Sequence, residues 1–484
     1  MQHKQTSDKP SLLIGAFLFC LCFVHFSPVT TLAAAPPALT DPDRIRYKPL
    51  SFHPPTADRI ILTNGLVVYL LENGELPLLK IRVVVRTGSI YDPPGKEGLA
   101  ELTATMMETG GIAGMTGNSV DEILESMAAL LQTSINRDYG TFSLSLLKND
   151  LEKGLDIFSR ILMQPVFEQD KLTLAKGLKI EDLRRIFDDP QKLAFREFGR
   201  LMYEDSQWGR VATRESISRL QRDDLIRTHE LFYNPENVMI AVSGDIGRKE
   251  AEILLNRYFG IWKLSEKKVP TPSLPHPREG EIFFLPKDIP QSVVLFGWFA
   301  PSKKEAQFYP FEILDFIVGS GGFRSRIFQE IRTNRGLAYS TGSFYKAGKE
   351  HGLFVAYALT KSESTVSVFS LIQSIIREIG EKPVLPEELK MARNAILNSF
   401  IFSFTSADQI AFQQLLLKYN DIPDDFLVSY RNKIDNVTAD EIRKVAGLYL
   451  AQGKAVVLII GNDAVYRDIS TTFYKIKRIE GKYD

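Results

Sequence analysis

The feature that most constrains this chain is a long internal repeat. The segment "DLIRTHELFYNPENVMIAVSGD" (Asp224–Asp245) aligns without a gap to "EIRKVAGLYLAQGKAVVLIIGN" (Glu441–Asn462), at an offset of 217 residues. In both segments an acidic residue begins an amphipathic helix, a short break follows, and an apolar strand ends at a glycine, Gly244 or Gly461. Solenoid repeats recur every ~20–50 residues. A period this long therefore indicates a duplicated domain.

A proline-rich stretch, "KKVPTPSLPHPREGE" (267–281), has almost no apolar periodicity and is typical of a stiff interdomain linker. It divides the chain into an N-terminal domain, 36–266, and a C-terminal domain, 282–484. Apolar strands alternate with helical patterns in both, so we expect an α+β fold. Each domain would be one mixed or antiparallel sheet covered by helices on one side. Within the first domain we expect a hairpin turning at Asn64-Gly65 and helices over 119–132 and 216–233.

The N-terminus has the pattern of a secretory signal peptide. Lys4 and Lys9 precede the apolar run "LLIGAFLFCLCFVHF" (12–26), and small residues follow at Ala33–Ala35, so residues 1–35 are expected to be removed. The alternative is an uncleaved membrane anchor, but fifteen apolar residues are fewer than the roughly 20 that a span needs. We expect a periplasmic or secreted protein without a stable membrane span. The anchored form remains the alternative.

Both cysteines of the chain, Cys20 and Cys22, lie inside that apolar run. Cleavage would therefore exclude disulfides, thiolate catalysis and cysteine metal sites together. Lys and Arg total 59, and so do Asp and Glu. This balance provides no general basic surface, so nucleic acid is not expected as a partner.

Several longer stretches carry a family resemblance, among them "TNGLVVYLLEN", "RTGSIYDPPGKEGLAEL" and "GGFRSRIFQEIRTNRGLAYSTGS". With these, the chain resembles the pitrilysin/insulinase-type zinc metallopeptidases. Their relatives include the mitochondrial processing peptidases and bacterial periplasmic or secreted pairs. The resemblance covers nearly everything after residue 35. It implies duplicated α+β domains that are joined by a linker and close like a clamp around a peptide.

Active members of that family carry His-x-x-Glu-His on the helix after a glycine turn. Two imidazoles on one helical face hold zinc, and the glutamate acts as general base on the bound water. In this chain Glu101, Ala104 and Thr105 stand at those positions, and only Glu181 remains at the position of a distal third ligand. The resemblance thus implies a degenerate zinc motif, with no metal held by this chain.

No other zinc site suggests itself. The chain after residue 35 has four histidines: His53, His229, His276 and His351. No two of them are at helical ligand spacing, and none has a carboxylate at such a spacing. We expect His229 to be an ordinary surface or half-buried imidazole. The sequence fits Glu181 as a solvated helix carboxylate at least as well as it fits a former zinc ligand.

In "EIRTNRGLAYS", Arg332 and Tyr339 are seven residues apart with Gly336 between them. They resemble the Arg/Tyr pair with which family members hold the substrate near the zinc. A guanidinium suits a carbonyl or carboxylate, and a phenol donates to a carbonyl or developing oxyanion. The plain alternative is an arginine favoured by a helix C-terminus and a half-buried strand tyrosine.

The combination implies a non-catalytic, substrate-binding subunit of a heteromeric zinc peptidase. The zinc would be in a homologous partner subunit, and the substrate would be a peptide. Two alternatives stay open: a free-standing peptide-binding or scaffold protein, and an active peptidase with an unrecognised site.

Overall fold

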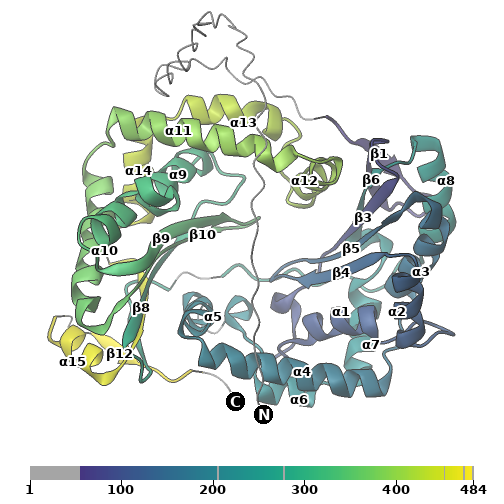
Figure 1. Cartoon of the computed structure of the whole chain (residues 1–484), viewed down its shortest axis with the longest axis horizontal. Helices are drawn as coiled ribbons and strands as arrows, with labels where there is room; N and C mark the ends of the chain where they lie inside the picture. Colours follow the sequence, from purple (N-terminus) through teal and green to yellow (C-terminus); the bar gives the residue numbers. More distant parts are fainter. Residues whose placement is uncertain (1–54, 204–205, 276–277, 452, 473–474, 482–484) are drawn as a thin grey trace, which may run out of the picture. The chain divides into compact units, whose positions relative to one another are not determined.

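Two six-stranded mixed sheets form the framework of the chain (Figure 1). The first has the strand order β1-β2-β6-β3-β5-β4 and the second β12-β7-β11-β8-β10-β9. The first sheet contains β1 (Asp58–Ile61), β2 (Val67–Glu72), β3 (Leu78–Val85), β4 (Leu130–Ile135), β5 (Gly140–Leu147) and β6 (Val238–Gly244). The second contains β7 (Ile282–Pro286), β8 (Gln291–Ala300), β9 (Ala338–Ala347), β10 (Gly352–Lys361), β11 (Val456–Gly461) and β12 (Ile476–Arg478). The order of their five equivalent strands is the same, as a duplication requires.

This computed structural model describes residues 55–484 except 204–205, 276–277, 452, 473–474 and 482–484. The expected signal segment, both cysteines, His53 and His276 lie outside the described residues. In the part that is described, no helix has the length and apolar character needed to cross a membrane.

Fifteen α-helices accompany the sheets in the described chain. In the first half these are α1 (Leu99–Thr109), α2 (Gly117–Ser126), α3 (Leu151–Met163), α4 (Gln169–Asp188), α5 (Pro190–Met202), α6 (Arg214–Arg219), α7 (Arg222–Phe232) and α8 (Arg248–Phe259). In the second half they are α9 (Phe308–Asp315), α10 (Thr365–Glu381), α11 (Pro386–Ile401), α12 (Ala407–Tyr419), α13 (Phe426–Asp435), α14 (Ala439–Tyr449) and α15 (Asp463–Thr472). Helices α4, α5 and α7 begin 217 residues before α11, α12 and α14. The offset found in the sequence thus extends well beyond the segments that revealed it.

The hairpin at Asn64-Gly65 is confirmed, with β1 antiparallel to β2 and Gly65 at φ 85°. The prediction of a helix over 119–132 is wrong at its C-terminal end. Helix α2 stops at Ser126, Ala128 adopts φ 48°, and the chain continues as β4. The helix expected over 216–233 is two helices, α6 and α7. The Asp224 carboxylate accepts the Gln221 backbone N–H at 3.0 Å, and this starts α7 as a separate helix.

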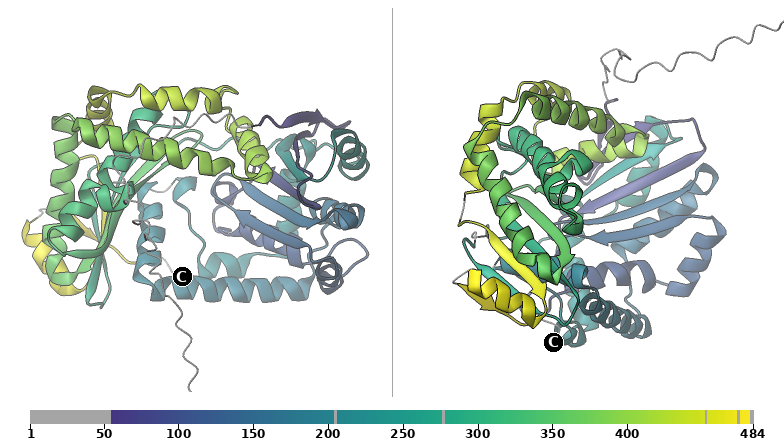
Figure 2. Two further views of the ribbon diagram at one scale, coloured as in Figure 1. Left: turned by 45° about the horizontal axis from the view of Figure 1, so that its top comes forward. Right: turned by 60° about the vertical axis from the view of Figure 1, so that its left-hand side comes forward.

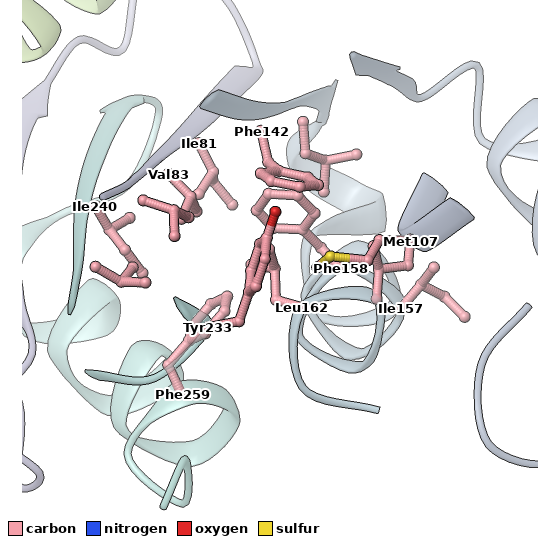
Figure 3. Close-up of a cluster of buried hydrophobic side chains, with 14 of the residues drawn as sticks. Ile81, Val83, Met107, Phe142, Ile157, Phe158, Leu162, Tyr233, Ile240 and Phe259 are labelled. Carbon is pink, nitrogen blue, oxygen red and sulfur yellow. The ribbon is translucent and has the colours of Figure 1, made fainter. Parts of the chain in front are cut away.

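One face of each sheet is covered by helices of its own half. Beneath the first sheet, Phe142 of β5 meets Phe158 and Leu162 of α3 in a buried cluster (Figure 3). The tyrosine that follows α7, Tyr233, packs edge-on against Phe142, with ring centroids 5.7 Å apart. Alternating strand residues supply this face, as the two-residue period of a strand requires.

The opposite face of each sheet is covered by a helix from the other half of the chain. The sequence pattern predicts helices on one face only and does not indicate this second layer. Helix α5 packs on β8 and β11 of the second sheet, while α12 packs on β2 and β6 of the first (Figures 1 and 2). Phe198 of α5 lies in one buried cluster with Leu295 and Leu458. The two helices begin at equivalent positions of the repeat, so the halves exchange the same element.

Close approach of backbone and side chains makes this exchange specific. A Cβ added to Gly297 of β8 would lie 2.3 Å from Cζ of Phe198, so only glycine leaves room for the ring. On the other side, Arg82 of β3 makes a two-point ion pair with Asp408 of α12, with Nε to Oδ1 at 2.7 Å. Apolar packing and this partly buried pair hold the two halves in one compact unit.

Candidate functional site

The helix at the degenerate motif, α1, begins with a buried carboxyl cap, Asp92. Backbone N–H groups of Gly98 and Ala100 donate to the two carboxylate oxygens of Asp92, at 2.7 and 2.8 Å. Burial raises the pKa of Asp92 to about 7, although both hydrogen bonds favour its ionised form. Gly98 has φ 97°, and a Cβ there would lie 2.4 Å from Cδ1 of Ile217. The glycine turn therefore has a packing reason that is independent of any metal.

The three motif positions of α1 are occupied by groups that have other partners. Glu101 forms an ion pair with Lys179 of α4. Ala104 is 1 % exposed and belongs to the core. The Thr105 hydroxyl donates to the Glu101 backbone carbonyl at 3.1 Å. An ammonium group on α4 thus contacts the first motif position.

Glu181 lies two residues after Lys179 on α4. Side chains two positions apart on an α-helix point in nearly opposite directions. Its carboxylate accepts Nη2 and Nε of Arg184 at 2.8 and 3.0 Å, and it also pairs with Arg185 at 3.4 Å. Hydrogen bonds from Arg184 lower the pKa of Glu181 to about 2. The α4 residue that reaches Glu101 is Lys179, and Glu181 is turned toward the two arginines.

These positions do not fit a zinc ion. Ala104 has no donor atom, the Thr105 hydroxyl is engaged, and the Glu101 carboxylate already has a cationic partner. Zinc in peptidases takes three protein ligands, and neutral imidazoles are the usual ones. Across the described part of the chain, no group of three or more His, Cys, Asp or Glu side chains is arranged to hold a metal.

The structure brings Arg332 and the backbone of Tyr339 together. Arg332 is on a π-helical segment, η8 (Phe328–Thr333), and its Nη1 donates to the Tyr339 carbonyl at 2.5 Å. Its guanidinium also lies 4.9 Å from the ring centroid of Phe328. Gly336, at φ 63°, makes the turn between them. Arg332 thus contacts the tyrosine main chain, not the phenol.

Both side chains face solvent. Arg332 is exposed, and Tyr339 is 57 % exposed near the start of β9, which is the edge strand of the second sheet. A second π-helical segment, η6 (Phe316–Ser320), lies just upstream. Short π-helical segments occur often at functional sites because they shift side chains out of the regular helical register. The half-buried strand tyrosine that was the plain alternative does not describe this exposed residue.

The two described histidines have protein partners. His229 is half-buried, as expected, with Nε2 2.8 Å from the Leu162 carbonyl and its ring stacked on Tyr233 at 5.2 Å. Nε2 of His351 lies 3.0 Å from Oη of Tyr203, which is a hydrogen-bonding distance. Burial, with a smaller effect of Arg137, lowers the pKa of His351 to about 4, so its imidazole is neutral at pH 7.

Sequence reasoning missed Lys179. Its contact with Glu101 joins residues 78 positions apart on two helices, and a single lysine in a charged helix carries no local signal. Only the packing of α1 against α4 identifies it.

Comparison with known proteins gives two matching family models. Residues 68–213 match the model described as insulinase (peptidase family M16), and residues 219–396 match the peptidase M16 inactive domain. Both segments lie within the duplicated part of the chain, and together they cover most of it.

Individual relatives have low sequence identity to this chain but align with most of its length. A protein of Rickettsia bellii named uncharacterized zinc protease is 25% identical over 338 residues, which cover 69% of this chain and 81% of that protein. A Helicobacter pylori protein named non-peptidase homolog YmxG is 25% identical over 337 residues, covering 68% and 76%.

Among solved structures, the peptidase M16 inactive domain from Pseudomonas fluorescens superposes with a TM-score of 0.77 at 22% identity. The superposition covers 84% of this chain and 98% of that one. This similarity is one of fold. The two family models together match more than half of the chain, which shows that it belongs to the insulinase family of peptidases, family M16.

Proposed function

We propose that this chain is the non-catalytic, substrate-binding subunit of a heteromeric zinc-dependent metallopeptidase. The observation that carries the proposal is the contrast between two sites. The motif positions of α1 are tied to Lys179 and offer no ligand set, whereas Arg332 and Tyr339 are exposed next to each other. Zinc would be held by a homologous partner with His-x-x-Glu-His, and this chain would hold none.

Two edge strands, β4 and β9, support peptide binding. β4 is the edge strand of the first sheet beside α1, and its side chains alternate between exposed and half-buried. β9 is the corresponding edge of the second sheet, with Tyr339 near its start. An extended peptide can add to such an edge through main-chain hydrogen bonds.

The role of this chain would be to bind and orient the peptide. The Arg332 guanidinium has donors beyond the one that it gives to the Tyr339 carbonyl, and these suit a substrate carbonyl or carboxylate. The Tyr339 phenol would donate to a carbonyl that gains charge during hydrolysis. Held in a fixed geometry, the two groups would contribute positioning to a reaction whose metal chemistry occurs on the partner.

The proposed location is the periplasm or the outside of the cell, because the N-terminal run has the pattern of a signal peptide. Membership of the family is consistent with a paired assembly, and the partner is proposed as a zinc-bearing homologue of similar size.

The test is peptide cleavage by this chain reconstituted with a co-purified zinc-bearing homologue. Arg332→Ala or Tyr339→Phe should reduce turnover by about 10²–10³, the usual effect of losing one preorganised donor. The double variant should lose less than the sum, because the two residues act as one unit. Both lie on the surface, so complex size and thermal stability should change little.

Arg335→Ala is the matched control. Arg335 is three residues from Arg332, exposed, and paired with Glu330 at 3.5 Å. Its removal should leave turnover unchanged. Wild-type turnover in the double variant would make the Arg332–Tyr339 pair structural. Peptide binding without any zinc-bearing partner in the native source would favour the free-standing scaffold.

A further inference from the structure

A cavity of about 870 Å³ lies between segments of both halves. Its walls come from the β4–β5 turn (136–139), helix α5 with its C-terminal end, the β9–β10 hairpin (344–351) and part of the linker (269–274). The volume is within the range of small-molecule sites, about 300–1,000 Å³. Neither the α1 motif positions nor Arg332 and Tyr339 line it. The cavity is therefore separate from the site described above.

Aromatic side chains dominate one part of the wall: Phe195, Phe198, Tyr203, Trp208 and Phe344. Tyr203 and Trp208 are stacked, with ring centroids 6.0 Å apart. The Trp208 indole N–H donates to the Ser273 carbonyl at 2.8 Å, which fixes the linker over this wall. Such a surface fits a flat or bulky apolar group.

A guanidinium lies against the same wall. Arg137, from the β4–β5 turn, places Cζ 4.7 Å from the ring centroid of Tyr203. A Cβ on Gly199 of α5 would lie 2.6 Å from its Nη2, so the absence of a side chain there gives the guanidinium its place. Among the described residues, no carboxylate is within ion-pair distance of Arg137. Lys349, in contrast, is paired with Asp421 at 2.7 Å.

The other charged groups of the wall leave the cavity cationic. Arg86, Arg137, Lys346 and Lys349 line it, against Asp138 and Glu350. Burial raises the pKa of Asp138, which disfavours its negative charge. The imidazole of His351, bonded to Tyr203, is neutral near pH 7. Arg137 therefore has no ion-pair partner among the described residues of the wall.

We propose that this cavity binds an aromatic or large apolar acid, with the carboxylate at Arg137 and the apolar group against Phe195, Trp208 and Phe344. The same chemistry is offered by the C-terminal residue of a peptide and by a free N-acylated aromatic amino acid. The site goes beyond the proposed function, since it needs neither a partner subunit nor the Arg332–Tyr339 pair.

The experiment uses the full chain without a partner and measures binding by calorimetry and by tryptophan fluorescence. The probes are N-acetyl-phenylalanine, its amide, and a peptide that ends in phenylalanine with a free carboxylate. The acid should bind at least about tenfold more tightly than the amide, the usual effect of a charge-assisted hydrogen bond. A peptide that binds more tightly than the free acid identifies a peptide C-terminus as the source. A peptide that does not bind while the acid does identifies the free acid.

Two variants test the role of Arg137 in different ways. Arg137→Gln removes the charge, and Gly199→Ala keeps the charge but displaces the guanidinium; each should weaken acid binding at least about tenfold. Arg248→Gln is the control, because Arg248 is exposed, lies outside the cavity and pairs with Asp58 at 3.2 Å. Equal binding of acid and amide, unchanged binding in both variants, or no binding of any probe by folded protein would overturn the proposal. None of these outcomes bears on turnover by a reconstituted pair.

Discussion

The contact between Gly297 and Phe198 predicts a strong energetic coupling across the two halves. Phe198 is 2 % exposed, and its ring fills the space that a Cβ on Gly297 would need. Gly297→Ala alone should lower the free energy of unfolding by about 1–3 kcal/mol through overpacking. Phe198→Ala alone should lower it by about 3–5 kcal/mol, because it removes a buried ring and leaves a cavity.

In the double variant the added methyl meets no ring, and its remaining close neighbour is the flexible Met202 side chain, with Sδ at 3.0 Å, so most of the overpacking is relieved. The loss should therefore stay close to that of Phe198→Ala, which is a coupling free energy of about 1–3 kcal/mol. Chemical denaturation followed by circular dichroism measures all three variants. Gly177→Ala is the control: Gly177 is inside α4, a Cβ there meets nothing within 4 Å, and the change should stabilise by about 0.5–1 kcal/mol. Additive losses from Gly297→Ala and Phe198→Ala would show that the ring does not occupy this place.

Two further predictions concern the metal and pH. The triple variant Glu101→His/Ala104→Glu/Thr105→His should not hold stoichiometric zinc, because Lys179 stays beside the first position and a glutamate is forced into the core. Elemental analysis measures the zinc content. About one tightly bound zinc per chain would contradict this prediction. Burial raises the pKa of Glu312 to about 7, so the folded state binds its proton more tightly than the unfolded state does, and the contribution of Glu312 to the free energy of unfolding should fall as pH rises from about 4.5 to 7. Glu312→Gln should flatten that dependence in denaturation curves, and an unchanged slope would refute the assignment.

The duplication was predictable from sequence because each copy ends in the same local pattern, a helix, a short break and an apolar strand closed by Gly244 or Gly461. The candidate positions Glu101, Arg332 and Tyr339 were found through resemblance to family motifs. Contacts between distant segments were not predictable. Lys179 meets Glu101 only because α4 packs on α1.

The helices α5 and α12 were missed for a related reason. Their apolar residues are matched to the other half of the chain, so the local pattern does not say which sheet they cover. Ala128 illustrates a smaller failure, since an alanine at φ 48° interrupts a helical pattern that its own sequence favours. The cavity combines segments that are far apart in the sequence, so no single local pattern indicates it.

The exchange of α5 and α12 has a consequence for how the molecule can be cut. A single break in the linker would leave each fragment still covering a sheet of the other, so the two pieces would remain together like the chains of an obligate dimer. A fragment expressed alone would expose the apolar faces that its missing partner covers, including Phe198 on one side and Leu415 on the other. Complementation of two separately made halves, and not solubility of either one, is the behaviour that this architecture favours.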